Sequence, residues 1–319
     1  MQKIRAAVIG VGYLGRFHAQ KYAQANGCEL LAVVDTRSEA REQVAAELGT
    51  RAVADYRELL GAVDAVSVVT PTPAHFAIAR DFLERGAHVL VEKPITETGA
   101  QARELIELAS RGRRILQVGH LERFNAAILA AEPYLNSPRF VECHRLAPYR
   151  ERGTDVNVVL DLMIHDIDIV QTIVAAPIST IDAVGTPVFS EEIDIANARI
   201  RFENGCVANA TASRVSLKTE RKLRVFEDDA YLSLDLQQKI ITLIRKRAAP
   251  PRPGELPVTI EEQSLEPGDA LKAEIDSFLG CIRSGGRPVV PGEAGLMALE
   301  TATRITEQVQ QSLAARRPR

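Results

Sequence analysis

Gly10-Val11-Gly12-Tyr13-Leu14-Gly15 is the stretch that decides the fold of the first part of this chain. It matches the pattern G-x-G-x-x-G, which is a weak signal alone because glycine triplets also occur in plain turns. The context strengthens the match. The apolar run Ile4–Ile9 precedes it, a helical pattern follows it, and Asp35 ends the next apolar run about twenty residues further on. We therefore predict a dinucleotide-binding βαβ unit.

Each residue of this stretch has an expected role in holding a dinucleotide. Gly10 permits the tight turn, Gly12 lets the backbone approach the pyrophosphate, and Gly15 lets the helix pack closely on the strand. Tyr13 and Leu14 open the helix, whose unpaired N–H groups face the phosphates.

Asp35 bears on the choice between the two nicotinamide cofactors. A carboxylate there accepts hydrogen bonds from the ribose and repels a 2′-phosphate, which favours NAD. Arg37 leaves NADP open, because a nearby arginine tolerates that phosphate. We expect Arg37 to face solvent or stack on the adenine, with Thr36 beside it in the cofactor site.

A second candidate cofactor segment is Thr70-Pro71-Thr72-Pro73-Ala74-His75. Its prolines hold the backbone extended, so it can lie along the cofactor. A plain connector from strand to helix is the alternative, and both descriptions can hold together. We include Thr70, Pro71 and His75 in the predicted cofactor site.

The first third of the chain alternates apolar runs with amphipathic stretches. The later apolar runs are Leu30–Val34, Ala65–Val69, His88–Val91 and Ile115–Val118, and the helical patterns lie near Arg16–Ala25, Glu39–Leu48, His75–Arg85 and Ala100–Arg111. This alternation, with runs that are apolar on both faces, predicts a doubly wound parallel sheet.

The pattern changes after residue 121. A helical stretch over roughly 156–174 precedes runs of period two, and two helical patterns close the chain. The runs are Ala196–Phe202, Val207–Ala212, Lys222–Phe226, Tyr231–Leu236 and Ile240–Ile244, and the closing helices are Ala270–Arg283 and Gly292–Leu313. Asn204-Gly205 is a hairpin signal between the first two runs. We predict an α/β protein with an N-terminal Rossmann domain, residues 1–121, and a C-terminal α+β domain with a large, mostly antiparallel open sheet, residues 122–319.

Glu92-Lys93-Pro94 follows the run His88–Val91 directly. A lysine at the carboxyl end of such a strand points into the crevice where an open α/β sheet holds its ligand. Lys93 is therefore the first candidate for chemistry, and Glu92 and Lys93 join the predicted cofactor site. A surface lysine at a strand end is the alternative.

A second candidate constellation lies in the helical stretch around Asp161 and His165. These side chains are one helical turn apart and can touch. A carboxylate beside an imidazole orients the ring and favours its protonated form, which suits a general base that takes a proton from an alcohol. A structural Asp–His pair and a metal site are the alternatives. Because no third ligand has convincing spacing, we predict no metal.

Composition narrows the class of protein. The chain has 319 residues, of which 46% are hydrophobic, and a net charge of −3. A nucleic-acid partner is not indicated, because such proteins carry concentrated basic faces. The four cysteines are scattered, and no apolar run is long enough to span a membrane. We expect a cytoplasmic protein with no membrane or nucleic-acid partner.

The glycine motif, Glu92-Lys93-Pro94 and Asp161-x-x-x-His165 together resemble the glucose–fructose oxidoreductase, inositol dehydrogenase and rhizopine catabolism family (Gfo/Idh/MocA). The resemblance covers essentially the whole chain, including Phe278–Gly285 and the closing helix. It implies NAD as the cofactor and homodimers or homotetramers built through the C-terminal sheet. It also implies that Lys93, Asp161 and His165 are catalytic, with His165 taking the hydroxyl proton and Lys93 stabilising the oxyanion.

Within the family, residues 119–125 and 161–168 resemble the nucleotide-sugar branch. This resemblance implies oxidation of a sugar hydroxyl to a ketone, most specifically the 3-hydroxyl of UDP-N-acetylglucosamine on the route to an amide-linked lipid A. Arginine suits a diphosphate, although ordinary surface charge is an equal alternative for Arg150 and Arg152. The expected substrate contacts are Lys93, Arg123, Asn125, Arg150, Arg152, Asp161 and His165. A dehydrogenase of a free sugar or polyol such as myo-inositol, and a dinucleotide-binding regulator without chemistry, remain open.

Overall fold

The structure is a computed structural model that describes residues 3–150, 156–248 and 255–316. Its contacts divide the chain into two units. The first unit comprises Met1–Phe124 and Asp269–Leu299, and the second comprises Asn125–Gly268 and Glu300–Arg319. This division differs from the predicted single boundary after residue 121, because the segment that contains the first closing helix packs with the N-terminal unit.

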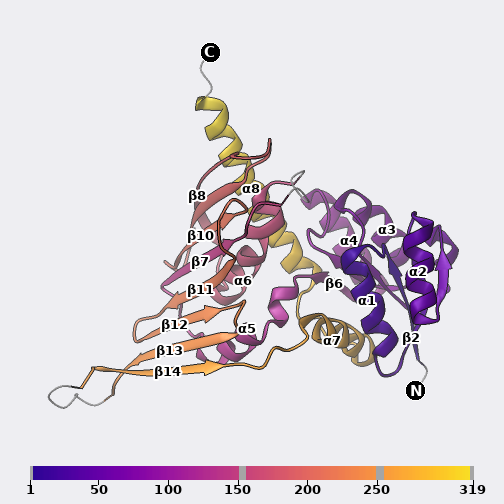
Figure 1. The fold of residues 1–319 in the computed structure, drawn as a ribbon, viewed down its shortest axis with the longest axis horizontal. Helices are drawn as coiled ribbons and strands as arrows, with labels where there is room; N and C mark the ends of the chain where they lie inside the picture. The colour runs from indigo at the N-terminus through magenta and orange to yellow at the C-terminus, as the bar shows by residue number, and fades with distance from the viewer. Residues whose placement is uncertain (1–2, 151–155, 249–254, 317–319) are drawn as a thin grey trace. The chain divides into compact units, whose positions relative to one another are not determined.

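The first unit is built on a parallel sheet of six strands (Figure 1). The strands are β1 (Ile4–Ile9), β2 (Cys28–Val34), β3 (Arg51–Val53), β4 (Ala65–Val68), β5 (His88–Glu92) and β6 (Leu116–Gly119). Their order, β3-β2-β1-β4-β5-β6, reverses direction between β1 and β4. This is the doubly wound arrangement that places a ligand at the carboxyl ends of the central strands, and it confirms the predicted fold class.

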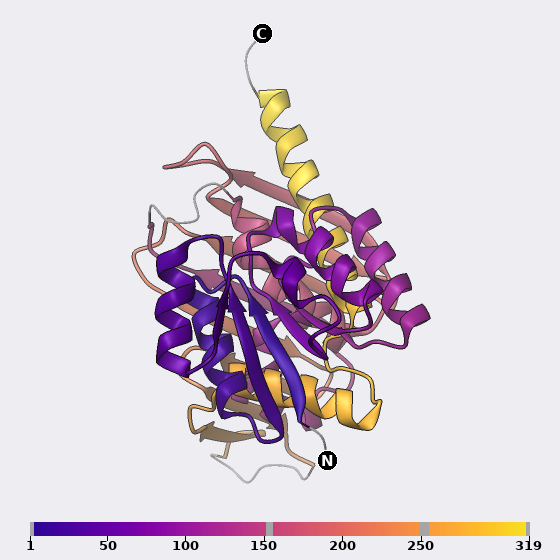
Figure 2. The same cartoon turned by 90° about the vertical axis from the view of Figure 1, so that its right-hand side faces the viewer.

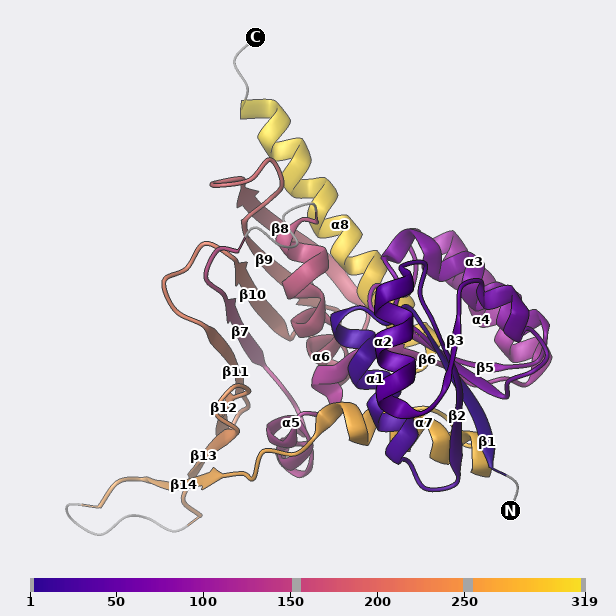
Figure 3. The ribbon, with the colours of Figure 1, turned by 45° about the vertical axis from the view of Figure 1, so that its right-hand side comes forward.

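Four helices flank this sheet. They are α1 (Tyr13–Gln24), α2 (Ser38–Leu48), α3 (Thr72–Glu84) and α4 (Gly99–Gly112). α1 and α2 lie on one face of the sheet and α3 and α4 on the other, so the two pairs stand on opposite sides of the strands in Figure 2. α7 (Ala270–Ser284) packs beside α1 (Figure 3). Tyr22 of α1 and Phe278 of α7 are both fully buried in the core that these helices share.

The second unit is built on a sheet of eight strands, in which β10 and β7 pair in parallel and the other neighbours are antiparallel. In sheet order the strands are β14 (Val258–Ser264), β13 (Ile240–Lys246), β12 (Ala230–Asp235), β11 (Glu220–Phe226), β7 (Phe140–Leu146), β10 (Val207–Ser213), β9 (Ile195–Phe202) and β8 (Ile178–Thr186). The predicted hairpin between β9 and β10 is confirmed, with Gly205 at a φ of +86°.

Two helices of the second unit cover one face of this sheet (Figure 1). They are α6 (Ile164–Val174) and the later part of α8 (Gly292–Arg316). Gln171 of α6 donates a hydrogen bond to Thr301 of α8 at 3.0 Å, and Gln308 of α8 donates to the carbonyl of Ile181 in β8 at 2.8 Å. The short helix α5 (Ala126–Ala131) packs near β12 and β13. No helix among the described residues is long and apolar enough to cross a membrane.

Candidate active site

The glycine motif forms a turn in which Gly10 and Gly15 have no room for a side chain. Gly10 has a φ of +87°, and a Cβ atom there would lie 2.5 Å from the carbonyl oxygen of Val69. A Cβ atom on Gly15 would lie 1.8 Å from the carbonyl oxygen of Gly10. α1 starts at Tyr13, which is exposed, and its first turn has neither a capping side-chain hydrogen bond nor an acidic residue. The amino end of α1 therefore suits an anion.

The Asp35 carboxylate closes this turn from the end of β2. Its Oδ2 accepts a hydrogen bond from the Val11 N–H at 3.0 Å, and its Oδ1 accepts one from the Arg37 N–H at 2.9 Å. Burial acts to raise the pKa of Asp35, but these bonds and the Arg37 guanidinium outweigh burial and hold the pKa below its ordinary value. Asp35 is therefore ionised near neutral pH.

Arg37 is mostly exposed and pairs with Asp35, with its Nε 3.3 Å from Oδ1. Thr36 is also exposed, and its carbonyl accepts a hydrogen bond from Arg41 at 3.2 Å. The expectation that Arg37 faces solvent agrees with its 67% side-chain exposure. Stacking of Arg37 on adenine remains a prediction.

The His75 ring bridges the segments that follow two neighbouring strands, β4 and β5. Its Nε2 lies 2.7 Å from the carbonyl oxygen of Thr70, after β4, and its Nδ1 lies 2.9 Å from the carbonyl oxygen of Pro94, after β5. Burial lowers the pKa of His75, so a neutral ring donates to one of these carbonyls at a time. Its ring thus fixes the backbone around Thr70, Pro71 and Lys93. α3 begins at Thr72, so the connector and the cofactor descriptions of this segment are compatible.

Lys93 and Glu92 lie at the carboxyl end of β5, and both are half-buried. The Glu92 carboxylate lies 3.2 Å from Nε2 of the buried His18 in α1. It also packs on the backbone of Gly119, where a Cβ atom would lie 2.5 Å from the Glu92 Oε1. Glu92, the residue before Lys93, is therefore held in place by contacts with both His18 and Gly119.

Asp161 and His165 lie on one continuous helical run in the second unit. Asp161 belongs to a π-helical segment, Val159–Met163, which passes directly into α6, and His165 lies in the first turn of α6. Both side chains are half-exposed, whereas Ile164 and Ile167 on the same run are fully buried. Single π turns inside α-helices often occur at functional sites. The predicted helix start near residue 156 is too early.

The contacts that anchor this helical run were not predicted from the sequence. The Asn157 side chain accepts hydrogen bonds from the Val159 and Leu160 N–H groups, at 3.1 Å each, and so caps the run. Asp166, next to His165, is buried and receives two hydrogen bonds from Arg145 of β7, at 3.0 and 2.8 Å. Bidentate, charge-assisted pairs of this kind fix the orientation of both side chains.

The predicted substrate contacts differ in their hydrogen-bond partners and in their exposure. Arg123 donates to the carbonyl of Val289 at 3.3 Å. Asn125 is buried, caps α5 through the Ala127 N–H at 3.1 Å, and donates to the carbonyl of Leu236 at 3.0 Å. Arg150 is exposed, and Arg152 lies outside the described residues.

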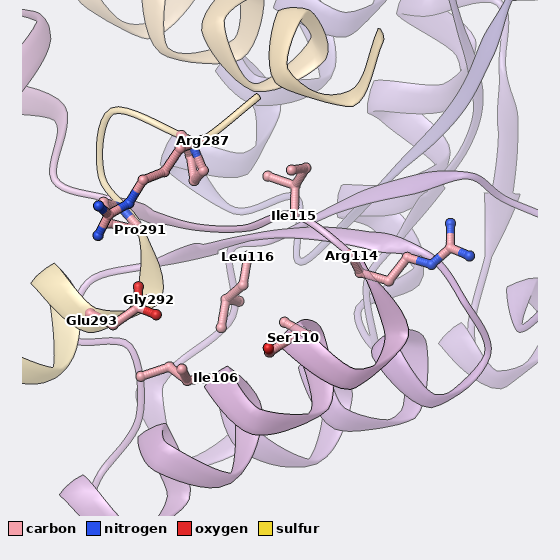
Figure 4. Close-up of a pocket in the computed structure, with 11 residues that line it drawn as sticks. Ile106, Ser110, Arg114, Ile115, Leu116, Arg287, Pro291, Gly292 and Glu293 are labelled. Atoms are coloured by element: carbon pink, nitrogen blue, oxygen red, sulfur yellow. The ribbon is translucent and has the colours of Figure 1, made fainter. Parts of the chain in front are cut away.

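A surface pocket of the first unit lies between α4, β6 and the segment 287–293 (Figure 4). Ile106 and Leu116 form its apolar part, and Arg114 and Arg287 stand at its edges. None of the residues predicted for the cofactor, the substrate or catalysis lines this pocket.

The residues around the glycine turn fit a dinucleotide. The turn leaves no room for a Cβ atom on Gly10 or Gly15, so the backbone itself forms the cradle. The buried Thr70 hydroxyl has no hydrogen-bond partner among the described residues, and it lies two residues after β4 at the reversal point of the sheet. An unpartnered hydroxyl at this position suits a polar ligand group.

Models of a known protein family match both halves of the chain. Residues 4–120 match the model of an oxidoreductase family described as NAD-binding Rossmann fold, GFO_IDH_MocA. Residues 145–314 match the C-terminal alpha/beta domain of the same family.

Individual relatives cover nearly the full length. UDP-N-acetylglucosamine 3-dehydrogenase of Acidithiobacillus ferrooxidans is 40% identical over 97% of this chain and 98% of that protein. A solved structure of that enzyme has a TM-score of 0.93, with 39% identity, and covers 98% of this chain and 99% of that chain. The scyllo-inositol 2-dehydrogenase of Bacillus subtilis is 26% identical over 95% of this chain and 93% of its own.

Levoglucosan dehydrogenase, solved in complex with NADH and levoglucosan, shares the fold with a TM-score of 0.86. It is 17% identical, over 97% of this chain and 98% of that chain, so this likeness concerns the fold alone. The two family matches and the full-length relatives lead to one conclusion: this chain belongs to the Gfo/Idh/MocA family of NAD-dependent oxidoreductases.

Proposed function

We propose that this dehydrogenase uses NAD to oxidise the 3-hydroxyl of UDP-N-acetylglucosamine to a ketone. One observation carries the proposal: the 40% identity to an enzyme of that name extends over essentially the full length of both chains. The inositol dehydrogenases are more distant, at 26% for the Bacillus subtilis enzyme over a similar length. The likeness therefore includes the C-terminal domain, where we place substrate recognition.

NAD, when bound, accepts the hydride that leaves the sugar carbon. The glycine turn and the amino end of α1 would hold its pyrophosphate, and Asp35 would accept hydrogen bonds from the adenosine ribose. Thr70, whose hydroxyl has no partner in the described part of the chain, would bind a polar group of the cofactor. An ionised Asp35 repels a 2′-phosphate, and its pairing with Arg37 limits how far that arginine can offset the repulsion.

Three side chains would carry the chemistry. An imidazole nitrogen of His165 takes the proton of the sugar hydroxyl, and Asp161 orients the ring and favours the imidazolium that forms. The Lys93 ammonium stabilises the negative charge that develops on the oxygen. Lys93 belongs to the first unit and His165 to the second, so their convergence on one alcohol is part of the proposal.

The remaining site residues would serve the nucleotide sugar. Arg123, Arg150 and Arg152 carry the charge that a diphosphate needs, and Asn125 would act through the placement of α5. A 3-keto sugar is a substrate for transamination, so the reaction fits the formation of an amide-linked lipid A in the cytoplasm. We also propose a homodimer or homotetramer built through the eight-stranded sheet.

The test is to incubate the purified protein with NAD and one alcohol at a time and to follow NADH absorbance. We expect a rise with UDP-N-acetylglucosamine. A rise with myo-inositol and none with UDP-N-acetylglucosamine would identify a polyol dehydrogenase. NAD binding without turnover of any alcohol would favour the regulator alternative.

A further inference from the structure

Two fully buried side chains and one that is mostly buried, from three separate elements, meet inside the first unit. His18 comes from α1, Glu92 from the end of β5 and Glu274 from α7. Each offers one atom, a ring nitrogen or a carboxylate oxygen, and these atoms lie within 4.8 Å of one another. His18 and Glu274 are completely buried, and the Glu92 side chain is 12% exposed. We call these residues the His18–Glu92–Glu274 cluster.

The burial of the Glu274 carboxylate requires an explanation. This residue is 0% exposed, and neither of its carboxylate oxygens has a hydrogen-bond partner among the residues that the structure describes. An unpaired, unbonded carboxylate inside a protein is strongly destabilising. Something must therefore neutralise this group in the folded state.

His18 is arranged as metal-binding histidines are. Its Nδ1 lies 3.2 Å from the hydroxyl of Ser67, and that hydroxyl lies 2.9 Å from the hydroxyl of Tyr22. Ring orientation by a hydrogen bond to the other nitrogen is the usual outer support of a metal-bound imidazole. Nε2 of His18 is left facing the carboxylates.

The contact between His18 and Glu92 also suits two ligands of one ion. Nε2 lies 3.2 Å from the Glu92 Oε1, yet it makes no aligned hydrogen bond. Zinc binds imidazole nitrogen and carboxylate oxygen at about 2.0–2.2 Å, so neighbouring ligands of a tetrahedral site lie about 3.3–3.6 Å apart.

We propose that the His18–Glu92–Glu274 cluster binds one divalent cation of the zinc class. A charge of +2 balances the two carboxylates and would leave the buried site neutral. The single imidazole favours a first-row transition ion over magnesium or calcium, which prefer a shell of six or more oxygen ligands. This proposal does not depend on the proposed function.

The ion would join α1, β5 and α7 within the first unit. Two ligands come from elements of the nucleotide-binding sheet and its first helix, and the third comes from α7, which is remote in the sequence. The three protein atoms would occupy three positions of a tetrahedral site and leave the fourth to a water molecule. The expected role of the ion is structural, because Glu274 and His18 have no solvent exposure that would admit a substrate. The residues are too far apart in the sequence to show metal-ligand spacing, so the prediction of no metal could not include them.

The test measures zinc binding and thermal unfolding of the full-length protein. Bound metal is removed with a chelator, the protein is titrated with Zn²⁺, and the mass of the complex is measured by native mass spectrometry. We expect one zinc ion per chain and a melting temperature that rises as zinc saturates the site. Glu274→Gln keeps the shape of the side chain but removes its charge, so this variant should lose both effects. Asp276→Asn changes an exposed carboxylate of the same helix, paired with Lys272, and should keep both.

Absence of zinc binding by the wild-type protein would overturn the proposal. If, in addition, Glu274→Gln melts at or above the wild-type temperature, the cluster holds a neutral carboxylic acid instead of an ion. Unchanged zinc binding by Glu274→Gln would place the ion elsewhere and would equally overturn the proposal. If Glu274→Gln fails to fold, His18→Gln replaces it, and loss of zinc binding is again the expected result.

Discussion

The backbone N–H of Val11 donates a hydrogen bond to Oδ2 of Asp35 at 3.0 Å, which ties the glycine turn to the end of β2. The same carboxylate also accepts hydrogen bonds from the backbone N–H and the guanidinium of Arg37. Asp35 therefore fixes the conformation of the turn, and we expect it also to accept hydrogen bonds from the ribose of the cofactor.

Replacing Asp35 should shift the cofactor preference. In Asp35→Ala the carboxylate that repels a 2′-phosphate is gone and Arg37 is released to pair with that phosphate. We expect the ratio of kcat/KM for NAD to kcat/KM for NADP to fall by at least ~10-fold, which corresponds to about 1.4 kcal/mol. Glu42→Gln, an exposed change in α2, is the control. An unchanged ratio in Asp35→Ala would show that Asp35 does not read the ribose.

Adding a methyl group at Gly15 should damage the first unit. Its Cβ atom would lie 1.8 Å from the Gly10 carbonyl oxygen, so α1 would have to move away from β1. We expect Gly15→Ala to lower the melting temperature and to weaken NAD binding, measured by calorimetry.

Gly280→Ala is the matched control for Gly15→Ala. Gly280 lies within α7, and nothing lies within 4 Å of the position its Cβ atom would take. Alanine is favoured over glycine in a helix by roughly 0.5–1 kcal/mol, so this variant should melt at or slightly above the wild-type temperature. Equal melting temperatures for the two variants would contradict the predicted crowding at Gly15.

Removing the charge at Lys93 should stop the chemistry while leaving the cofactor in place. Loss of one group that stabilises an oxyanion lowers kcat by roughly 10²–10³-fold, and we expect Lys93→Met to lose at least that much. NAD affinity, measured by calorimetry, should stay close to the wild-type value. Lys272→Met, at an exposed position on α7, controls for the loss of a lysine. Turnover of Lys93→Met at the wild-type rate would remove Lys93 from the mechanism.

His88 should make stability depend on pH. Burial is the largest cause that lowers its pKa, to about 4, followed by the Arg114 charge. The neutral Nδ1 accepts a hydrogen bond from the Ile115 N–H at 2.9 Å. The unfolded chain binds the proton more readily, so stability should be complete above the ordinary pKa of 6.5 and should fall as the pH drops toward about 4.

The measurement for His88 is the melting temperature across that pH range for the wild type and for His88→Gln. Glutamine has no titrating group, so the variant should show a shallower fall at acid pH. Parallel curves for the two proteins would show that His88 is not responsible.

Local chemistry explains which parts of the fold could be predicted. The glycine turn, β1, β5 and the helices between them were predicted because each is encoded by neighbouring residues: apolar strands, a glycine motif and amphipathic periods. β3 was missed because it has three residues. β14 was missed because it is mostly exposed at the sheet edge and so carries no apolar pattern.

Long-range juxtapositions could not be predicted. The packing of α7 beside α1 joins residues far apart in the chain, and the His18–Glu92–Glu274 cluster depends on it. Arg145 looked like one more charge in the sequence, although it is buried opposite Asp166. The candidate residues at Lys93, Asp161 and His165 came from motifs, and their catalytic roles remain predictions.

The transfer of one hydrogen atom from the sugar to the cofactor tests the proposed reaction. The protein is incubated with NAD and UDP-N-acetylglucosamine that carries deuterium at C3 of the sugar, and the reduced cofactor is weighed by mass spectrometry. We expect the deuterium to appear in the nicotinamide ring of the product. Reduced cofactor without deuterium, or no reduced cofactor at all, would contradict it.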